Sequence, residues 1–179
     1  MYKRQIFGVT QYQKKKAAKE YAESVKTYSD NLELATVTML KGAGDAEDCG
    51  NLIKNVWYNA IYKEKDDETD KYTRPGGYFV SDFNDALGNL FVDSSFSSKI
   101  DSIDKNQDTV NSLMKKLKNP PEEYKDAYDA LSDFYDAYLA LTGCATDPSG
   151  SLQTYSSTFN DADTDTLNAY KAMQQYLGD

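Results

Sequence analysis

The sequence predicts an all-α protein, an up-and-down helical bundle of four main helices plus one short helix, with a long first helix. Apolar side chains recur at alternating intervals of three and four residues through most of the chain, which is the spacing of one helix face. No segment shows the period-two alternation of a strand, and no longer internal repeat is visible. The 179 residues suffice for one domain with its own core.

The longest regular pattern predicts one continuous helix from about Lys14 to Lys65. Gly42 and Gly44 each cost about 1 kcal/mol relative to alanine in a helix, so two helices with a kink at Gly42 to Gly44 are the alternative. In either case these small residues let another helix approach closely. The predicted buried positions are Tyr21, Val25, Tyr28, Leu32, Ala35, Met39, Gly42, Ala46, Cys49, Ile53, Val56 and Ala60.

A connector and a short helix follow this pattern. Residues 66–77 are charged and end in Arg74-Pro75-Gly76-Gly77, a composition typical of a loop. Ser94 or Ser95 is suited to cap the helix after the short one. The short helix carries Phe79, Phe83, Ala86, Leu87, Leu90 and Phe91, and the next helix carries Phe96, Ile100, Ile103, Val110, Met114 and Leu117.

Pro120 and Pro121 separate the last two helices from the preceding ones, because proline ends one helix and suits the first turn of another. The turn at residues 147–151 supplies a serine cap for the final helix. The expected buried faces are Tyr124, Ala127, Leu131, Phe134, Tyr138 and Leu141, and then Leu152, Tyr155, Phe159, Ala162, Ala169, Met173 and Tyr176.

The charge of the chain argues against a nucleic-acid partner. Acidic residues outnumber basic ones 29 to 20, for a formal net charge of -9. A field of this sign repels phosphate backbones and anionic membranes. Its ordinary consequence is solubility.

The chain contains no histidine, the commonest general base and metal ligand. Ser-His-Asp and Cys-His nucleophile systems are therefore excluded, and no phosphate- or dinucleotide-binding motif is present. Residues 104–108 and 161–165 have alternating oxygen ligands but lack the glycine and glutamate of a calcium loop. We expect no catalytic residue, metal or cofactor, and a hydrolase using Asp or Glu is the less favoured alternative.

The 15 tyrosines suggest a possible binding surface, since tyrosine combines apolar area with a polar tip. Tyr128, Tyr135 and Tyr138 are the candidate partner-binding residues. The alternative is that these rings line the edge of the core while the neighbouring carboxylates face solvent. Trp57, next to predicted buried positions, is expected in the core.

Cys49 and Cys144 lie far apart and outside any Cys-x-x-Cys pattern, which excludes a zinc ribbon and a redox motif. They form a disulfide only if the fold brings them together in an oxidising compartment, and buried free thiols are an equal alternative.

The first residues resemble a foreign sequence. Met1-Tyr2-Lys3-Arg4-Gln5 resembles translated transposon-adaptor DNA of sequencing libraries. A short apolar segment, residues 6–10, precedes three lysines, Lys14 to Lys16, which is the pattern expected at the end of a membrane span. The segment is much shorter than the roughly 20 residues that a span requires. We expect residues 1–13 to be an adaptor scar with a remnant of a truncated anchor, and 14–179 to be a single bundle domain. A frayed helix start is the alternative.

The chain after Gln5 resembles uncharacterised bacterial proteins in which an N-terminal anchor precedes a helical ectodomain. This resemblance implies no activity and no functional residue. It favours a non-enzymatic interaction module, membrane-tethered or secreted, that binds an unknown protein partner. Lysines beside a span normally mark its cytoplasmic side, so an external location requires stronger positive charge upstream. The alternative is a cytoplasmic structural or assembly protein that self-associates through its first helix.

Overall fold

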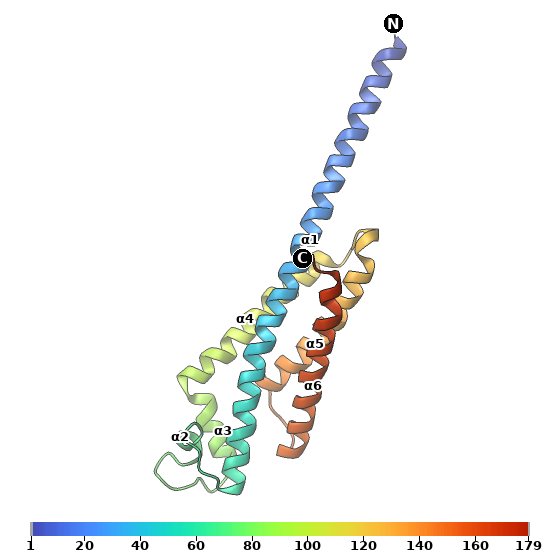
Figure 1. The fold of residues 1–179 in the computed structure, drawn as a ribbon. Coiled ribbons are helices and arrows are strands. Elements are labelled where there is room, and N and C mark those ends of the chain that lie inside the picture. The colour runs from blue at the N-terminus through green and yellow to red at the C-terminus, as the bar shows by residue number, and fades with distance from the viewer. Residues whose placement is uncertain (1, 179) are drawn as a thin grey trace.

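The computed structural model describes residues 2–178, with side chains from residue 11 onward. Met1 and the side chains of the predicted adaptor scar and apolar remnant lie outside this description. The described chain is all-helical and forms a helical bundle, as predicted (Figure 1). Its elements are α1 (Tyr2–Tyr62), α2 (Asp70–Thr73), α3 (Phe83–Val92), α4 (Ser94–Leu117), the 3-10 turn η1 (Glu122–Tyr124), α5 (Lys125–Thr146), α6 (Leu152–Met173) and the 3-10 turn η2 (Gln174–Tyr176).

Helix α1 is unbroken, which confirms the continuous helix and shows that the alternative of a kink at Gly42 to Gly44 is wrong. A Cβ atom added at Gly42 would lie 2.1 Å from the side-chain oxygen of Asn106, and one added at Gly50 would lie 2.1 Å from the ring of Phe159. These two glycines therefore mark the places where α4 and α6 pack closely against α1. The helix ends where Lys63 adopts a left-handed conformation, with φ of 60°.

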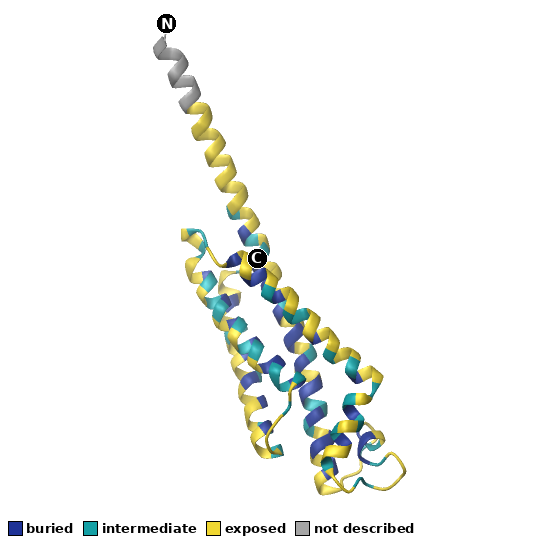
Figure 2. Cartoon of the chain, turned by 180° about the vertical axis from the view of Figure 1, so that it is seen from behind, coloured by how far each residue is buried: buried dark blue, intermediate teal, exposed yellow. Residues whose placement is uncertain are grey.

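The predicted buried face of α1 is confirmed from Tyr28 to Ala60, where every predicted position is buried. Tyr21 is exposed and Val25 is only half-buried, so the prediction fails at these two positions. The other helices end at this level, and residues 11–24 project beyond them with every side chain exposed (Figure 2). We call residues 11–24 the arm.

The connector after α1 contains the single turn α2, which was not predicted. Trp57 is buried between the rings of Phe83 and Tyr155, each 5.6 Å away between ring centroids, so its predicted place in the core is confirmed. The cap of α4 is neither Ser94 nor Ser95. Asp93 occupies the N-cap position and accepts hydrogen bonds from the N–H groups of Ser95 and Phe96.

Helices α4, α5 and α6 run up and down beside α1 and complete the core (Figure 1). Ser151 caps α6 in a capping box with Thr154, which confirms the predicted serine cap. A polar link runs through the core: the Tyr138 hydroxyl donates to the Asn106 side chain over 2.7 Å, and Asn106 donates to the carbonyl of Thr38 over 3.0 Å. This link ties α5, α4 and α1 together.

Candidate functional site

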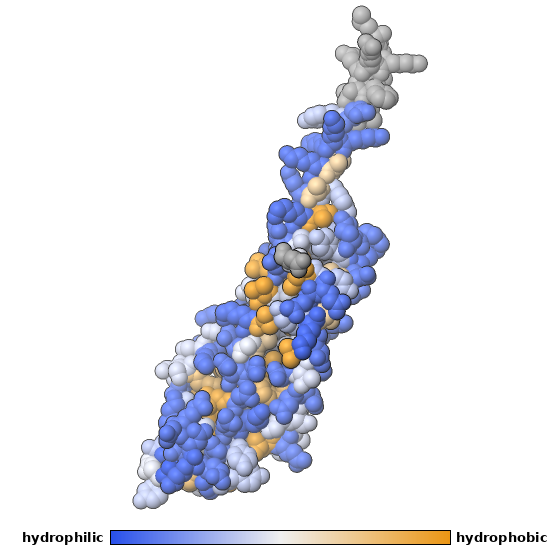
Figure 3. All heavy atoms as spheres, in the orientation of Figure 1, coloured by the Kyte–Doolittle hydropathy of each residue, from blue (hydrophilic) through white to orange (hydrophobic). Residues whose placement is uncertain are grey.

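The clearest surface feature is a stripe of apolar side chains on the part of α1 that the bundle leaves uncovered. Leu34, Val37 and Leu40 are 52%, 56% and 40% exposed, and Leu167 of α6 is 51% exposed. On the face seen in Figure 3, hydrophobic side chains gather in the region where Figure 1 places α1 and α6. Single exposed apolar residues are ordinary, but several on neighbouring helices form a surface suited to another protein.

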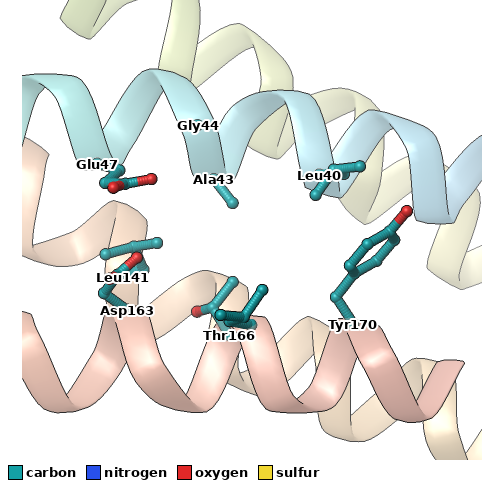
Figure 4. A pocket seen from close by; sticks show the side chains of 9 residues that line it. Leu40, Ala43, Gly44, Glu47, Leu141, Asp163, Thr166 and Tyr170 are labelled. Atoms are coloured by element: carbon teal, nitrogen blue, oxygen red, sulfur yellow. The ribbon is translucent and has the colours of Figure 1, made fainter. Parts of the chain in front are cut away.

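A groove runs between α1 and α6 beside this stripe, with a cavity of about 110 Å³. Leu40 lies opposite Tyr170 at one end, and Glu47 lies opposite Asp163 at the other (Figure 4). Gly44 lies between them, and a Cβ atom added there would meet nothing within 4 Å. The other residues that line the groove are Ala43, Leu141, Thr166 and Leu167.

At the acidic end of the groove, Glu47, Asp48 and Asp163 make no ion pair among the described residues. Partial burial and the nearby carboxylates of Asp163 and Asp48 raise the pKa of Glu47 above its ordinary value. The described residues contain no cluster of three or more Cys, Asp or Glu side chains that could hold a metal ion. The arrangement therefore suits a cationic side chain beside Glu47.

Two of the predicted tyrosines share a second groove. Tyr128 and Tyr135 line a cavity of about 480 Å³ between α4 and α5, together with Lys115 and Lys118. The Tyr135 hydroxyl donates to the Asn111 side chain, and burial raises the pKa of Tyr135. Both rings are half-buried, so their prediction as partner-binding residues stays a prediction.

The prediction for Tyr138 as a partner-binding residue is wrong. Its side chain is 0% exposed and its hydroxyl is bonded to Asn106 inside the bundle. Burial raises the pKa of Tyr138. The position belongs to the buried face of α5, where the seven-residue spacing from Leu131 places it.

Cys49 and Cys144 are free thiols in the structure, so the predicted possible disulfide is not formed. Cys49 is buried, and this burial raises its pKa to about 11. Cys144 is half-buried, and its carbonyl accepts a hydrogen bond from the Tyr155 hydroxyl over 3.2 Å. Burial also raises the pKa of the Cys144 thiol, and a raised pKa disfavours the nucleophilic thiolate form of both side chains.

The stripe on α1 was not predicted from the sequence. Leu34, Val37 and Leu40 recur every three residues, which could have marked a second apolar face beside the predicted one. A groove of about 640 Å³ near the start of α6, whose walls include the exposed rings of Tyr58 and Tyr62, was not predicted either.

No described helix is long and apolar enough to cross a membrane. Comparison of the chain with models of protein families, with curated proteins and with solved structures finds no match.

Proposed function

We propose that the protein is a non-enzymatic interaction module that binds a protein partner through the exposed surface of α1 and α6. The observation that carries this proposal is the stripe of Leu34, Val37 and Leu40, which continues onto α6 at Leu167. Apolar anchors at the centre of a surface with charged residues around them are typical of protein interfaces.

A photo-crosslinking amino acid placed at Val37 tests this proposal in living cells. Position 101, an exposed aspartate on α4, provides the control. We expect a discrete crosslinked product from position 37 that is absent from position 101 and is lost when Leu167→Glu is added. The same pattern of products from both positions would contradict an interface on α1 and α6.

We also propose that the module is membrane-tethered or secreted. The arm supports this, since a rigid exposed helix of 14 residues, about 21 Å long, would hold the bundle away from an anchoring surface. Sequencing the gene upstream of the codon for Ile6 tests the proposal. A coding sequence there without a signal or span would contradict it.

The second candidate is a cytoplasmic structural or assembly protein that self-associates through α1. It is favoured by the uncovered face of α1, which continues past the groove to the exposed rings of Tyr58 and Tyr62. Fractionation of the cells that make the protein distinguishes a cytoplasmic location from a membrane-bound or secreted one. Recovery in the cytosolic fraction supports the second candidate, and recovery with membranes or in the medium supports the first.

A further inference from the structure

We propose that the partner of this surface is a second copy of the chain, bound with its α1 antiparallel to the first and a two-fold axis beside Val37. This inference rests on the proposed interaction function and names its partner. It is carried by the order of charges along the uncovered face of α1.

The uncovered face is a regular one. Its members follow one another at intervals of three or four residues, so they lie along one side of the helix. Every member is exposed, and the buried positions that face α4 and α5 lie on the other side. The uncovered face consists of Lys26, Asp30, Glu33, Val37, Leu40, Gly44 and Asp48.

When two copies of this face pack antiparallel, charges of one copy lie opposite charges of the other sign in the second copy. When two α1 helices run antiparallel and cross at Val37, a residue before Val37 meets the residue equally far after it in the other copy. Lys26 then lies opposite Asp48 of the second copy. A parallel pair would instead place each charge beside its own duplicate, which is destabilising.

A second pair of charges agrees with this direction. Glu33 and Lys41 are both exposed and each lies four residues from Val37, so the carboxylate of one copy approaches the ammonium group of the other. Glu33 makes no ion pair among the described residues. Lys41 lies 2.8 Å from Asp45, and this exposed contact leaves its ammonium group free to take another carboxylate.

The apolar stripe occupies the centre of the same arrangement. Val37 meets Val37 of the second copy, and Leu34 lies opposite Leu40 on both sides of the axis. Asp30 lies opposite Gly44, whose missing side chain leaves room for the approach of the second helix. Such an interface uses the same patch on both copies, as in the commonest class of protein dimers.

Charge reversal tests the register. In sedimentation equilibrium we expect the native chain to form dimers, and Glu33→Lys to raise the dimer dissociation constant about tenfold, because two attractive pairs become repulsive. The double variant Glu33→Lys, Lys41→Glu restores opposite charges and should return the constant to within about threefold of the native value. Asp101→Lys makes the same change in net charge on α4 and should leave the constant nearly unaltered.

A single added thiol tests the axis. Val37→Cys should oxidise to a covalent dimer, since the two side chains meet, whereas Asp101→Cys and the native chain should stay uncrosslinked under the same conditions. Circular dichroism verifies that each variant is folded. A dimer in which Val37→Cys crosslinks no better than Asp101→Cys would overturn the antiparallel register.

The failure of this inference is distinguishable from failure of the proposed function. A native chain that stays monomeric at about 100 μM, well above the micromolar range of ordinary specific binding, would overturn pairing between copies. If position 37 then still crosslinks to a different protein in cells, the interaction function remains supported. If it crosslinks to nothing, both proposals are wrong.

Discussion

Gly42 and Gly88 show how the same residue type has opposite consequences at two places in the fold. A Cβ atom at Gly42 would lie 2.1 Å from the Asn106 side chain and 3.0 Å from the ring of Tyr138, whereas Gly88 in α3 has nothing within 4 Å. Asn106 cannot move without breaking its hydrogen bonds to Tyr138 and Thr38. Close packing therefore explains Gly42, and nothing in the structure explains Gly88.

We predict that Gly42→Ala lowers the free energy of unfolding by about 1–3 kcal/mol through overpacking. Gly88→Ala should raise it by about 0.5–1 kcal/mol, because alanine is the better helix former and the site is exposed. Urea denaturation of the two variants and the native chain measures both changes. Equal effects of the two substitutions would show that α4 does not approach α1 at Gly42.

Asp93, at the start of α4, makes a pH-dependent contribution to the stability of the fold. Hydrogen bonds from the Ser95 hydroxyl and from the N–H group of Phe96 lower its pKa from the ordinary 3.8 to about 2. The folded state therefore binds this proton less tightly than the unfolded state does. The stabilisation from Asp93 is fully present above pH 3.8 and is lost as the pH falls through about 2.

We predict that Asp93→Asn, which keeps a capping side chain without the charge, removes this pH dependence. Thermal unfolding of both chains between pH 7 and pH 2 should show the native chain ahead at neutral pH and the difference disappearing towards pH 2. A difference that stays constant over this range would contradict the lowered pKa of Asp93.

Helix α1 has two parts that are stabilised differently. From Tyr28 onward its buried face packs against the other helices, and the Tyr28 hydroxyl donates to the carbonyl of Leu117 over 3.0 Å. The arm has only exposed side chains, two exposed Lys–Glu pairs at 3.8 Å, and a hydrogen bond from Tyr21 to Glu123. Such pairs contribute little, so the helical arm depends on the buried part to nucleate it.

We predict that a chain beginning at residue 20 unfolds within about 3 °C of the native chain, because no buried contact is lost. A chain beginning at residue 33 serves as the control, since it also lacks the buried Tyr28 and Leu32 and should unfold well below the native temperature. Differential scanning calorimetry at low micromolar concentration measures both. A large loss of stability in the chain beginning at residue 20 would show that the arm stabilises the fold.

The periodicity of the sequence predicted the buried face of α1 from Tyr28 to Ala60, because burial on one side of a covered helix repeats regularly, but it could not show that Tyr21 and Val25 extend beyond the other helices. It was also sufficient for the Ser151 cap, where a turn and a serine coincide. It could not select Asp93 over Ser94 or Ser95, since all three residues can cap and the choice depends on where α3 ends.

The candidate site was less predictable than the fold. Periodicity identifies which positions of α1 are buried, but which remaining positions α6 covers depends on how the helices are placed in space. The spacing of Leu34, Val37 and Leu40 can mark a second apolar face, but only the folded chain shows that no other helix covers it. Tyr138 illustrates the reverse case, because its own predicted place on the buried face of α5 conflicted with a role in binding.

Charge is unevenly distributed along the chain. The arm carries four lysines and two glutamates, whereas residues 25–179 carry 14 basic and 27 acidic side chains. Each copy has a net charge of -9, which opposes association of two copies at low ionic strength. Pairing therefore requires the local match of charges around Val37 and burial of the apolar stripe to exceed this long-range repulsion.

If the folded chain pairs and the unfolded chain does not, stability must depend on concentration. We predict that the midpoint of thermal unfolding of the native chain rises by about 2 °C for each tenfold increase in concentration above the dimer dissociation constant. Glu33→Lys should show this rise only at about tenfold higher concentration, because its dimer is weaker, while Asp101→Lys should follow the native curve. A midpoint that is independent of concentration in all three chains would mean that the surface of α1 adds nothing to stability by self-pairing.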